Sequence, residues 1–374
     1  MNDPADLTCP TCDRAFPAAR DEPWRCRCGS PLELQHHPFI SGGDNPLFDL
    51  DAWRFRRSIE ASETSSLQVT LGEGCTPLVD APSWDCTFKL EYVSPTGSFK
   101  DRGAATTLSR AAALGVEHVI EDSSGNAGAA IATYAARAGI DATIYVPANA
   151  SANKVAAIER VGATIVRIDG SRQAVTDACI ETVESGDGWY ASHAWNPSFY
   201  AGTMTFAFDL LAQRDGRVPD AIVAPIGHGT LFLGAYRGFR ALFDAGVIDR
   251  MPRMLGAQAA GCAPIVDRID PQSAGSGGVS DGGHVATGIQ IVEPVRAEAI
   301  VAAVEETDGG AIAVADEVVE RELERLHHHG FYVEPTSAVA PAALRVYRER
   351  GVLAPGADVV VPLTGSGLKV AYYS

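Results

Sequence analysis

The sequence of 374 residues contains very little lysine, and almost all of its positive charges are arginines. Only Lys89, Lys100, Lys154 and Lys369 are lysines among its 30 lysine and arginine residues. Aspartate and glutamate outnumber these with 47 residues, so the formal net charge is −17. Nucleic acids and anionic membranes both require basic surfaces, and we therefore expect neither as a partner. A lysine-poor, acidic composition also indicates adaptation to high salt, where negative surface charge maintains solubility.

Long apolar runs are absent as well. No uninterrupted apolar segment reaches the roughly 18 residues of a membrane-spanning helix, so no membrane span is predicted. A hydrophobic content of 46% and a charged content of 21% are typical of a globular protein with two or three domains. Residues 1–6 are acidic and polar, unlike a secretory signal, and we expect a cytoplasmic protein.

The sequence contains eight cysteines, and half of them lie close together near the N-terminus. Cys9 and Cys12 form a C-x-x-C pair, and Cys26 and Cys28 form a C-x-C pair. Four thiolates in two close pairs suit a tetrahedral zinc ion, and so short a segment cannot build a core without such a link. We predict a structural zinc ribbon over residues 1–34. The alternative is a ribbon that keeps its shape without a metal.

One of the four lysines has distinctive surroundings. Lys100 lies in the segment Ser94–Gly103, which reads SPTGSFKDRG. Arginine stays protonated at ordinary pH, whereas lysine can lose its proton and attack a carbonyl to form a Schiff base. In a chain that otherwise uses arginine for positive charge, Lys100 is therefore a candidate nucleophile. The alternative is an ordinary surface lysine.

Short β-rich segments alternate with helical patterns from residue 116 onward. This alternation predicts an α/β fold with parallel sheets covered by helices on both faces. The predicted strands are 117–122, 142–146, 164–169, 220–226, 253–258 and 358–363. The predicted helices are 126–137, 151–161, 171–185, 230–245, 295–307, 316–329 and 337–350. Residues 36–66 are predicted to form a linker leading into a short helix, and the glycine-rich segment 273–283 is predicted to be a flexible loop able to act as a lid.

Two strand-to-helix turns have sequences suited to binding anions. The first is Ser123-Ser124-Gly125-Asn126, where backbone N–H groups at a helix start and two hydroxyls form an anion site. An ordinary capped turn is the alternative. The second is residues 227–231 (GHGTL), whose glycines allow the backbone to wrap around a phosphate. A dinucleotide-binding fingerprint would require glycine where Phe232 stands, which disfavours NAD.

Together these segments resemble the pyridoxal-phosphate (PLP) enzymes of fold type II, and the threonine synthases in particular. The resemblance rests on SPTGSFKDRG at 94–103, GEGCTPL at 72–78, EPTSA at 334–338 and LTGSGLK at 363–369. The last of these is similar to the TGHGLK ending of threonine synthases, with Ser366 in place of histidine. Relatives in this group often carry a ribbon.

The resemblance implies a particular domain organisation. The expected fold is α/β, with two doubly wound α/β domains of PLP fold type II preceded by a small zinc ribbon. The expected domains are the ribbon (1–34), a linker and the first part of the large PLP domain (35–104), a smaller α/β domain (105–204) and the remainder of the large domain (205–374). A homodimer is expected, because dimers are usual in this group.

Roles for individual residues also follow from the resemblance. Lys100 would form the Schiff base with PLP and, once displaced by the substrate in an external aldimine, would remove the Cα proton. Asn126 would hydrogen-bond the phenolic oxygen of PLP, and the hydroxyl of Thr364 would face its pyridine nitrogen. The PLP phosphate would be held by Gly227, His228, Gly229, Thr230 and Leu231, and the substrate carboxylate by Ser123, Ser124 and Gly125.

The sequence departs from the threonine synthase pattern where the phosphate of the substrate would bind. The family segment NS-NP-R-EGQKT corresponds to residues 193–205, in which His193 replaces asparagine, Phe199 replaces arginine and Met204 replaces lysine. In addition, His228 replaces the first asparagine of the phosphate loop. A dianionic phosphate normally requires arginine, lysine or several N–H donors.

We expect a PLP-dependent carbon–oxygen lyase that acts on an L-amino acid. The first expectation is a threonine synthase-like reaction, which converts O-phosphohomoserine to threonine and phosphate. The alternatives are a serine or threonine ammonia-lyase, a β-elimination or β-replacement enzyme similar to cysteate synthase, and a non-catalytic PLP-binding protein.

Overall fold

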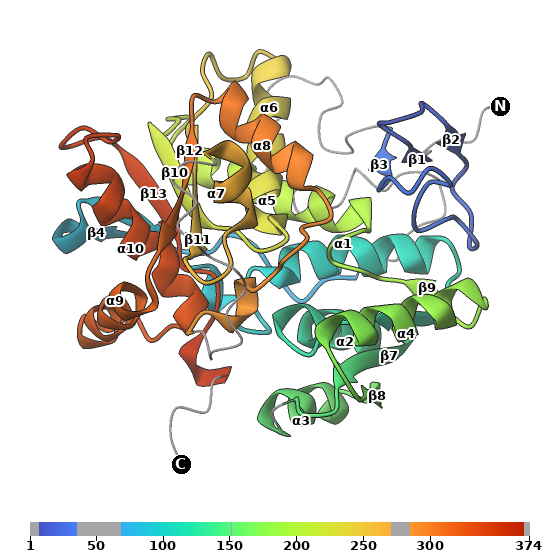
Figure 1. Cartoon of the computed structure of the whole chain (residues 1–374). Helices are drawn as coiled ribbons and strands as arrows, with labels where there is room; N and C mark the ends of the chain where they lie inside the picture. Colours follow the sequence, from blue (N-terminus) through green and yellow to red (C-terminus); the bar gives the residue numbers. More distant parts are fainter. Residues whose placement is uncertain (1–6, 36–68, 151, 271–284, 370–374) are drawn as a thin grey trace. The chain divides into compact units, whose positions relative to one another are not determined.

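The computed structural model describes residues 7–35, 69–150, 152–270 and 285–369 (Figure 1). The linker and the lid predicted from the sequence lie outside these residues. The chain divides into two compact units. Unit 1 consists of Met1–Glu73 and Lys100–Thr205, and unit 2 of Gly74–Phe99 and Phe206–Ser374. The domain boundaries inferred from the sequence stay predictions. Among the helices that the structure describes, none is long and apolar enough to cross a membrane.

Unit 1 is built on a four-stranded parallel sheet with strand order β8-β7-β6-β9. Its elements are α1 (Lys100–Ala113), β6 (His118–Glu121), α2 (Asn126–Ala138), β7 (Asp141–Pro147), α3 (Ala152–Arg160), β8 (Thr164–Ile168), α4 (Arg172–Glu184), β9 (Trp189–Tyr190) and the greater part of α5 (Pro197–Gln213). Ile144 and Val146 of β7 pack with α1 and α2, whereas Tyr145 packs with α4. Successive residues of a strand point to opposite faces, so helices cover both faces of this sheet.

The ribbon belongs to unit 1 and has a very small core. Its strands β1 (Leu7–Thr8), β2 (Ala15–Phe16) and β3 (Glu33–Leu34) form an antiparallel sheet with order β2-β1-β3. The buried side chains of this part are Leu7, Leu32 and two of the clustered cysteines, Cys9 and Cys26. So little apolar surface does not stabilise a fold of this size, and a further link between its loops is needed.

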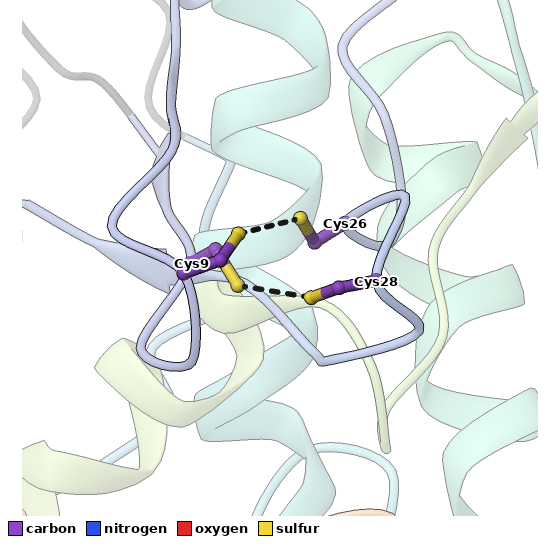
Figure 2. A group of neighbouring side chains, drawn as sticks. Cys9, Cys26 and Cys28 are labelled. Carbon is purple, nitrogen blue, oxygen red and sulfur yellow. Dashed lines mark hydrogen bonds between the residues drawn. The ribbon is translucent and has the colours of Figure 1, made fainter.

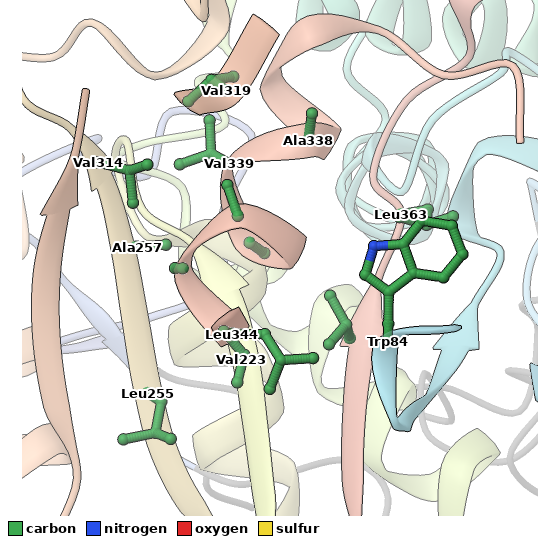
Figure 3. Packing of buried hydrophobic residues seen from close by; sticks show 14 of the residues in the cluster. Trp84, Val223, Leu255, Ala257, Val314, Val319, Ala338, Val339, Leu344 and Leu363 are labelled. Carbon is green, nitrogen blue, oxygen red and sulfur yellow. The ribbon is translucent and has the colours of Figure 1, made fainter. Parts of the chain in front are cut away.

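Unit 2 is built on a six-stranded sheet with order β12-β11-β10-β13-β5-β4, parallel except for the β4–β5 pair. Its elements are β4 (Leu78–Ala81), η2 (Pro82–Trp84), β5 (Cys86–Lys89), η3 (Glu91–Val93), β10 (Ala221–Pro225), α6 (Thr230–Asp244), β11 (Arg253–Ala259), α7 (Pro264–Ile269), η4 (Thr287–Ile289), α8 (Ala297–Glu306), β12 (Gly310–Val314), α9 (Asp316–His328), α10 (Pro335–Glu349), β13 (Val359–Pro362) and η5 (Gly367–Lys369). Figure 3 shows Val339 and Leu344 of α10 beside Val223 and Ala257 of the sheet, in one buried apolar cluster. This packing fixes the start of α10 against the carboxyl ends of the central strands.

The six strands and seven helices predicted between residues 117 and 363 are all present, with ends that shift by at most two residues. The short helix predicted after the linker lies outside the described residues. The sequence patterns did not predict α1, α5, α7, β4, β5, β9 or β12. Helix α5 shows why, because nearly all of its residues are buried. A helix that is apolar on every side has no amphipathic period from which to recognise it.

Helices α1 and α5 approach each other very closely within unit 1. A Cβ atom on Gly103 of α1 would lie 2.3 Å from the ring of Phe199 in α5. A Cβ atom on Gly202 of α5 would lie 2.0 Å from the carbonyl oxygen of Arg102. The hydroxyl of Thr106 also donates a 2.7 Å hydrogen bond to the carbonyl oxygen of Ser198. Glycine at both positions is therefore what allows Phe199 to lie against the first turns of α1.

We predict that Gly103→Ala lowers the free energy of unfolding by about 1–3 kcal/mol, because the added methyl group overpacks the contact with Phe199. Urea denaturation of the purified protein would measure this. Gly310→Ala is the matched control, since the nearest atoms to its Cβ would lie at 3.9 Å, an ordinary contact distance. Equal stability of the two variants would contradict the close approach of α1 and α5.

Candidate active site

Lys100 is the first residue of α1 and directly follows a segment that is fixed by backbone hydrogen bonds. Within unit 2, the N–H of Phe99 donates to the carbonyl of Thr364 at 3.1 Å, and the N–H of Ser366 donates to the carbonyl of Gly97 at 2.9 Å. Ser98 and Gly365 form an antiparallel bridge between these two bonds. The structure thus pairs the lysine motif with the C-terminal motif, two segments that the sequence analysis identified separately.

An apolar ring lies beneath the amine of Lys100. Its Nζ is 5.5 Å from the centroid of the Phe199 ring. Phe199 is fully buried, and Met204, one turn further along α5, is almost fully buried. These are the two positions where the threonine synthase pattern has arginine and lysine. Both are therefore part of the packed interior of unit 1 and carry no charge.

The segment Ser123–Asn126 connects the carboxyl end of β6 to the first turn of α2. Gly125 is the N-cap of α2, and no side chain caps the helix there. The N–H of Gly125 donates to Oγ of Ser123 at 3.3 Å, which holds the turn in a tight conformation. All four residues are partly exposed. Backbone N–H groups and hydroxyls at a helix N-terminus can bind a carboxylate, as the sequence predicted for this segment.

Asp122 anchors this segment from its N-terminal side. Its carboxylate accepts hydrogen bonds from Arg172 at 2.7 Å, from Thr176 at 2.7 Å and from the hydroxyl of Tyr190 at 3.0 Å. Burial alone would raise the pKa of Asp122, but Arg172 and the two hydroxyls outweigh it and lower the pKa below its usual range. The sequence analysis missed this anchor because its partners lie far along the chain on other elements.

Glu121, the last residue of β6, pairs with His193. The Oε1 atom of Glu121 lies 2.6 Å from Nδ1 of His193, and the glutamate is fully buried. Burial chiefly raises the pKa of Glu121, with a further contribution from Asp122. His193 follows β9, the parallel neighbour of β6, so both residues lie at the carboxyl edge of the sheet. The sequence analysis noted His193 only as a departure from the family pattern.

The glycine-rich segment of unit 2 joins β10 to α6. Gly229 is the N-cap of α6 with a φ of 75°, and no side chain caps the helix. A Cβ atom on Gly229 would lie 2.5 Å from Ile300, and one on Gly227 would lie 3.1 Å from the Cα atom of Ile289. The positive φ and the close contact favour glycine strongly at position 229, and a side chain at position 227 would be tightly packed. The bare backbone leaves room for an anion at the helix start. His228 is partly exposed, whereas Thr230 and Leu231 are buried.

Thr364 lies at the same edge of the unit 2 sheet as this loop. It follows β13, which is the parallel neighbour of β10. Its hydroxyl is 3.1 Å from that of Ser337, which in turn accepts a 2.9 Å hydrogen bond from the N–H of Gly365. Ser337 is a residue that the sequence analysis placed in a supporting segment without a specific role. Ligands of open α/β sheets bind at the carboxyl ends of such strands.

These residues fit PLP. The cofactor requires an amine for its aldehyde, N–H donors for its phosphate and a neutral partner for its pyridine nitrogen. Lys100, the start of α6 and the hydroxyl of Thr364 supply groups of these three kinds. The roles of Asn126 and of the other residues assigned from the sequence stay predictions.

A cavity of about 620 Å³ in unit 1 is a separate feature. It is lined by ribbon residues that include Arg20 and Trp24, and by His118 and Tyr190 of the α/β part. None of the residues predicted to bind PLP or substrate lines it. This cavity is therefore not formed by the residues of the candidate active site.

The four clustered cysteines lie close together in the ribbon. Their Sγ atoms are all within 4.8 Å of one another, and Figure 2 shows Cys9, Cys26 and Cys28 pointing toward one another. The Sγ atoms of Cys9 and Cys28 are 3.5 Å apart, and those of Cys12 and Cys26 are 3.6 Å apart. Burial raises the pKa of Cys9, but the N–H groups of Thr11 and Cys12 lower it, on balance to about 6. Sulfurs at this spacing can surround one tetrahedral metal ion.

We predict that Arg172→Met lowers the free energy of unfolding by about 1 kcal/mol at neutral pH, because the arginine is partly exposed and water screens part of its interaction. The pKa of Asp122 is lowered in the folded state, so its contribution is present above about pH 4 and is lost as pH falls through the lowered pKa. The stability difference should therefore shrink in acid. Urea denaturation at several pH values would measure it, with Arg167→Met as the control. A difference that is unchanged in acid would contradict the assignment.

A comparison with protein families matches residues 69–365 to the model described as "Pyridoxal-phosphate dependent enzyme". Among curated proteins, the chain is 36% identical over 312 residues to the threonine synthase of Methanosarcina acetivorans, covering 80% of this chain and 76% of that protein. It is 31% identical over 360 residues to the threonine synthase of Methanocaldococcus jannaschii, covering 92% of this chain and 88% of that protein.

Solved structures share the fold at low sequence identity. Maize serine racemase aligns with a TM-score of 0.66 at 23% identity, covering 78% of this chain and 88% of that one. An L-serine ammonia-lyase from Rhizomucor miehei aligns with a TM-score of 0.66 at 22% identity, covering 78% and 93%. The predicted α/β architecture of PLP fold type II is thereby confirmed. The chain belongs to the family of pyridoxal-phosphate-dependent enzymes and is a threonine synthase-like lyase.

Proposed function

We propose that this lyase removes the β-hydroxyl of L-serine or L-threonine, with release of ammonia and a 2-oxo acid. When bound, PLP supplies an aldehyde that captures the substrate amine and a ring that accepts the electron pair released at Cα. Lys100 is the base that takes the Cα proton. The segment Ser123–Gly125 holds the substrate carboxylate at the start of α2, and Asp122 keeps that segment in place.

The observation that carries this proposal is that the side chains near Lys100 are either apolar or acidic. The Phe199 ring lies 5.5 Å from its amine, and the nearby carboxyl edge of the sheet carries Glu121 and Asp122. A dianionic phosphate would need cationic partners, and burying it beside carboxyl groups would be unfavourable. A neutral hydroxyl side chain requires no such partner. The substrate with the uncharged side chain therefore suits these residues better.

Threonine synthase activity on O-phospho-L-homoserine is the second candidate. Its support is the identity of 36% and 31% to two curated threonine synthases over most of the chain. In this reaction, His193 and His228 would have to replace the arginine and lysine of the family pattern. The Nδ1 atom of His193 already pairs with Glu121, which leaves that histidine less able to neutralise a phosphate.

We predict that the purified protein with added PLP forms 2-oxo acid from L-serine or L-threonine. A coupled dehydrogenase assay would measure this, beside inorganic phosphate release from O-phospho-L-homoserine and O-phospho-L-serine. Lys100→Arg is the matched variant, because arginine keeps the charge but does not form a Schiff base, and we expect a loss of at least about 1,000-fold.

The outcomes separate the candidates. Phosphate release from O-phospho-L-homoserine that depends on Lys100, without 2-oxo acid from the hydroxyl amino acids, would favour the second candidate. Neither product, from protein whose visible absorbance shows bound PLP, would contradict both.

We also propose that the four cysteines of the ribbon hold one structural zinc ion. The supporting observation is the distance of at most 4.8 Å between all their Sγ atoms, together with the small apolar core of the ribbon. Four protein ligands leave no open coordination position, so the metal would stabilise the ribbon without taking part in the reaction.

We predict about one zinc ion per chain in the purified protein, measured by atomic absorption. Cys26→Ser should lose it and should make the ribbon more sensitive to proteolysis, because a ligand is missing. Cys75→Ser is the control, since Cys75 lies outside the cluster. The proposal is wrong if the Cys26 and Cys75 variants contain equal amounts of zinc.

A further inference from the structure

We propose that Glu121 and His193 form a proton-donating pair, and that His193 protonates the oxygen that leaves the substrate's Cβ. This assignment rests on the proposed β-elimination of L-serine or L-threonine. Such a reaction requires a base at Cα, which is the role of Lys100, and an acid at the leaving oxygen, because hydroxide is a poor leaving group.

The topology brings the pair to the carboxyl edge of the unit 1 sheet. Glu121 ends β6, and His193 follows the neighbouring parallel strand β9. The segment Ser123–Asn126, which is proposed to hold the substrate carboxylate, begins two residues after Glu121. Both members of the pair thus flank the segment that would bind the amino acid.

The contact between the two side chains fixes the orientation of the imidazole. Nδ1 of His193 lies 2.6 Å from Oε1 of Glu121, a short distance typical of a charge-assisted hydrogen bond. The other carboxyl oxygen, Oε2, is buried and makes no hydrogen bond to any residue that the structure describes. His193 is therefore the hydrogen-bond partner that accounts for a fully buried carboxyl group at this position. Because Nδ1 contacts Glu121, a proton that the imidazole passes to the substrate would come from Nε2.

His193 and Lys100 approach the same aromatic ring. The imidazole of His193 packs edge-on against Phe199 with 6.1 Å between ring centroids, and Nζ of Lys100 lies 5.5 Å from the centroid of that ring. Two groups that can exchange protons thus lie around one apolar side chain. This arrangement suits an elimination in which one group removes a proton and the other supplies one.

Burial of the pair favours retention of a proton. It is the main cause that raises the pKa of Glu121, and Asp122 adds to it, whereas Arg172 and Lys100 act in the opposite direction. The negative charge of Asp122 is compensated by its ion pair with Arg172. The contact of 2.6 Å allows the carboxyl group and the imidazole to share one proton.

Lys100 and His193 together provide both proton transfers of the elimination. Lys100 takes the Cα proton, and the electron pair of that C–H bond forms the Cα–Cβ double bond. The Cβ–O bond breaks, its electron pair leaves with the oxygen, and the oxygen takes a proton from Nε2 of His193 to depart as water. Solvent returns a proton to His193 before the next turnover. No oxidant or reductant is required.

The test compares two substrates that differ in their leaving group. L-Serine needs a proton on the departing oxygen, whereas β-chloro-L-alanine releases chloride without one. We expect His193→Asn to lower kcat for L-serine by about 100- to 1,000-fold and to change kcat for β-chloro-L-alanine by less than about 3-fold. Glu121→Gln should shift the alkaline limb of the L-serine pH profile to lower pH, because the carboxyl group no longer supports the protonated imidazole.

His118→Asn is the matched control. His118 lies at the opposite end of β6, and its two ring nitrogens are hydrogen-bonded to the carbonyl of Asp187 at 2.7 Å and to the hydroxyl of Thr143 at 2.9 Å. His118→Asn should leave the ratio of kcat for L-serine to kcat for β-chloro-L-alanine unchanged. A second readout is independent of turnover: NMR titration of the His193 imidazole in cofactor-free protein should move to lower pH in Glu121→Gln.

Each result has a defined meaning. Equal loss of both activities in His193→Asn, or no loss of either, would overturn the role of His193 while leaving the proposed function intact. An unchanged NMR titration would overturn the role of Glu121. If the unaltered protein converts neither substrate, the proposed β-elimination itself fails, and the acid assignment fails with it.

Discussion

The short backbone pairing between residues 97–99 and 364–366 is the constraint on which the candidate site depends. Two main-chain hydrogen bonds of 3.1 and 2.9 Å join segments of unit 2 that are far apart in the sequence. Lys100 is the next residue along the chain after the first of these segments. The same pairing holds Thr364 at the carboxyl edge of its sheet, beside the hydroxyl of Ser337. Because these hydrogen bonds join main-chain atoms, they fix the backbone geometry of the two segments. They place little constraint on which side chains occupy these positions.

A second constraint is the close approach of α1 and α5 in unit 1. Gly103 and Gly202 let the helices approach until Phe199 lies flat against the first turns of α1. A charged side chain at position 199 would be buried there at considerable cost unless it found a partner. The replacement of arginine by phenylalanine is therefore compatible with tight packing, and it removes a cation from the neighbourhood of Lys100. Under the proposed function, packing and substrate preference are linked through this one position.

Much of the fold followed from local patterns in the sequence. Strands such as β7 are nearly continuous apolar runs, because helices cover both faces of the parallel sheet, and the helices between them are bounded by recognisable turns. Helix α5 and the two-residue strand β9 escaped prediction, the first because it is buried on all sides and the second because it is too short to show a period. Glycine-rich turns were recognisable because each requires a bare backbone at a helix start.

The sequence by itself determined the motifs that are coded in contiguous residues: the lysine motif of the PLP family, the two turns predicted to bind anions and the cysteine spacing of the ribbon. Only the tertiary structure decided which distant side chains meet. The Glu121–His193 contact, the anchoring of Asp122 by Arg172 and the position of Phe199 beneath Lys100 all join residues on different elements. Such contacts depend on strand order and helix packing, and neither is written in any local stretch of the chain.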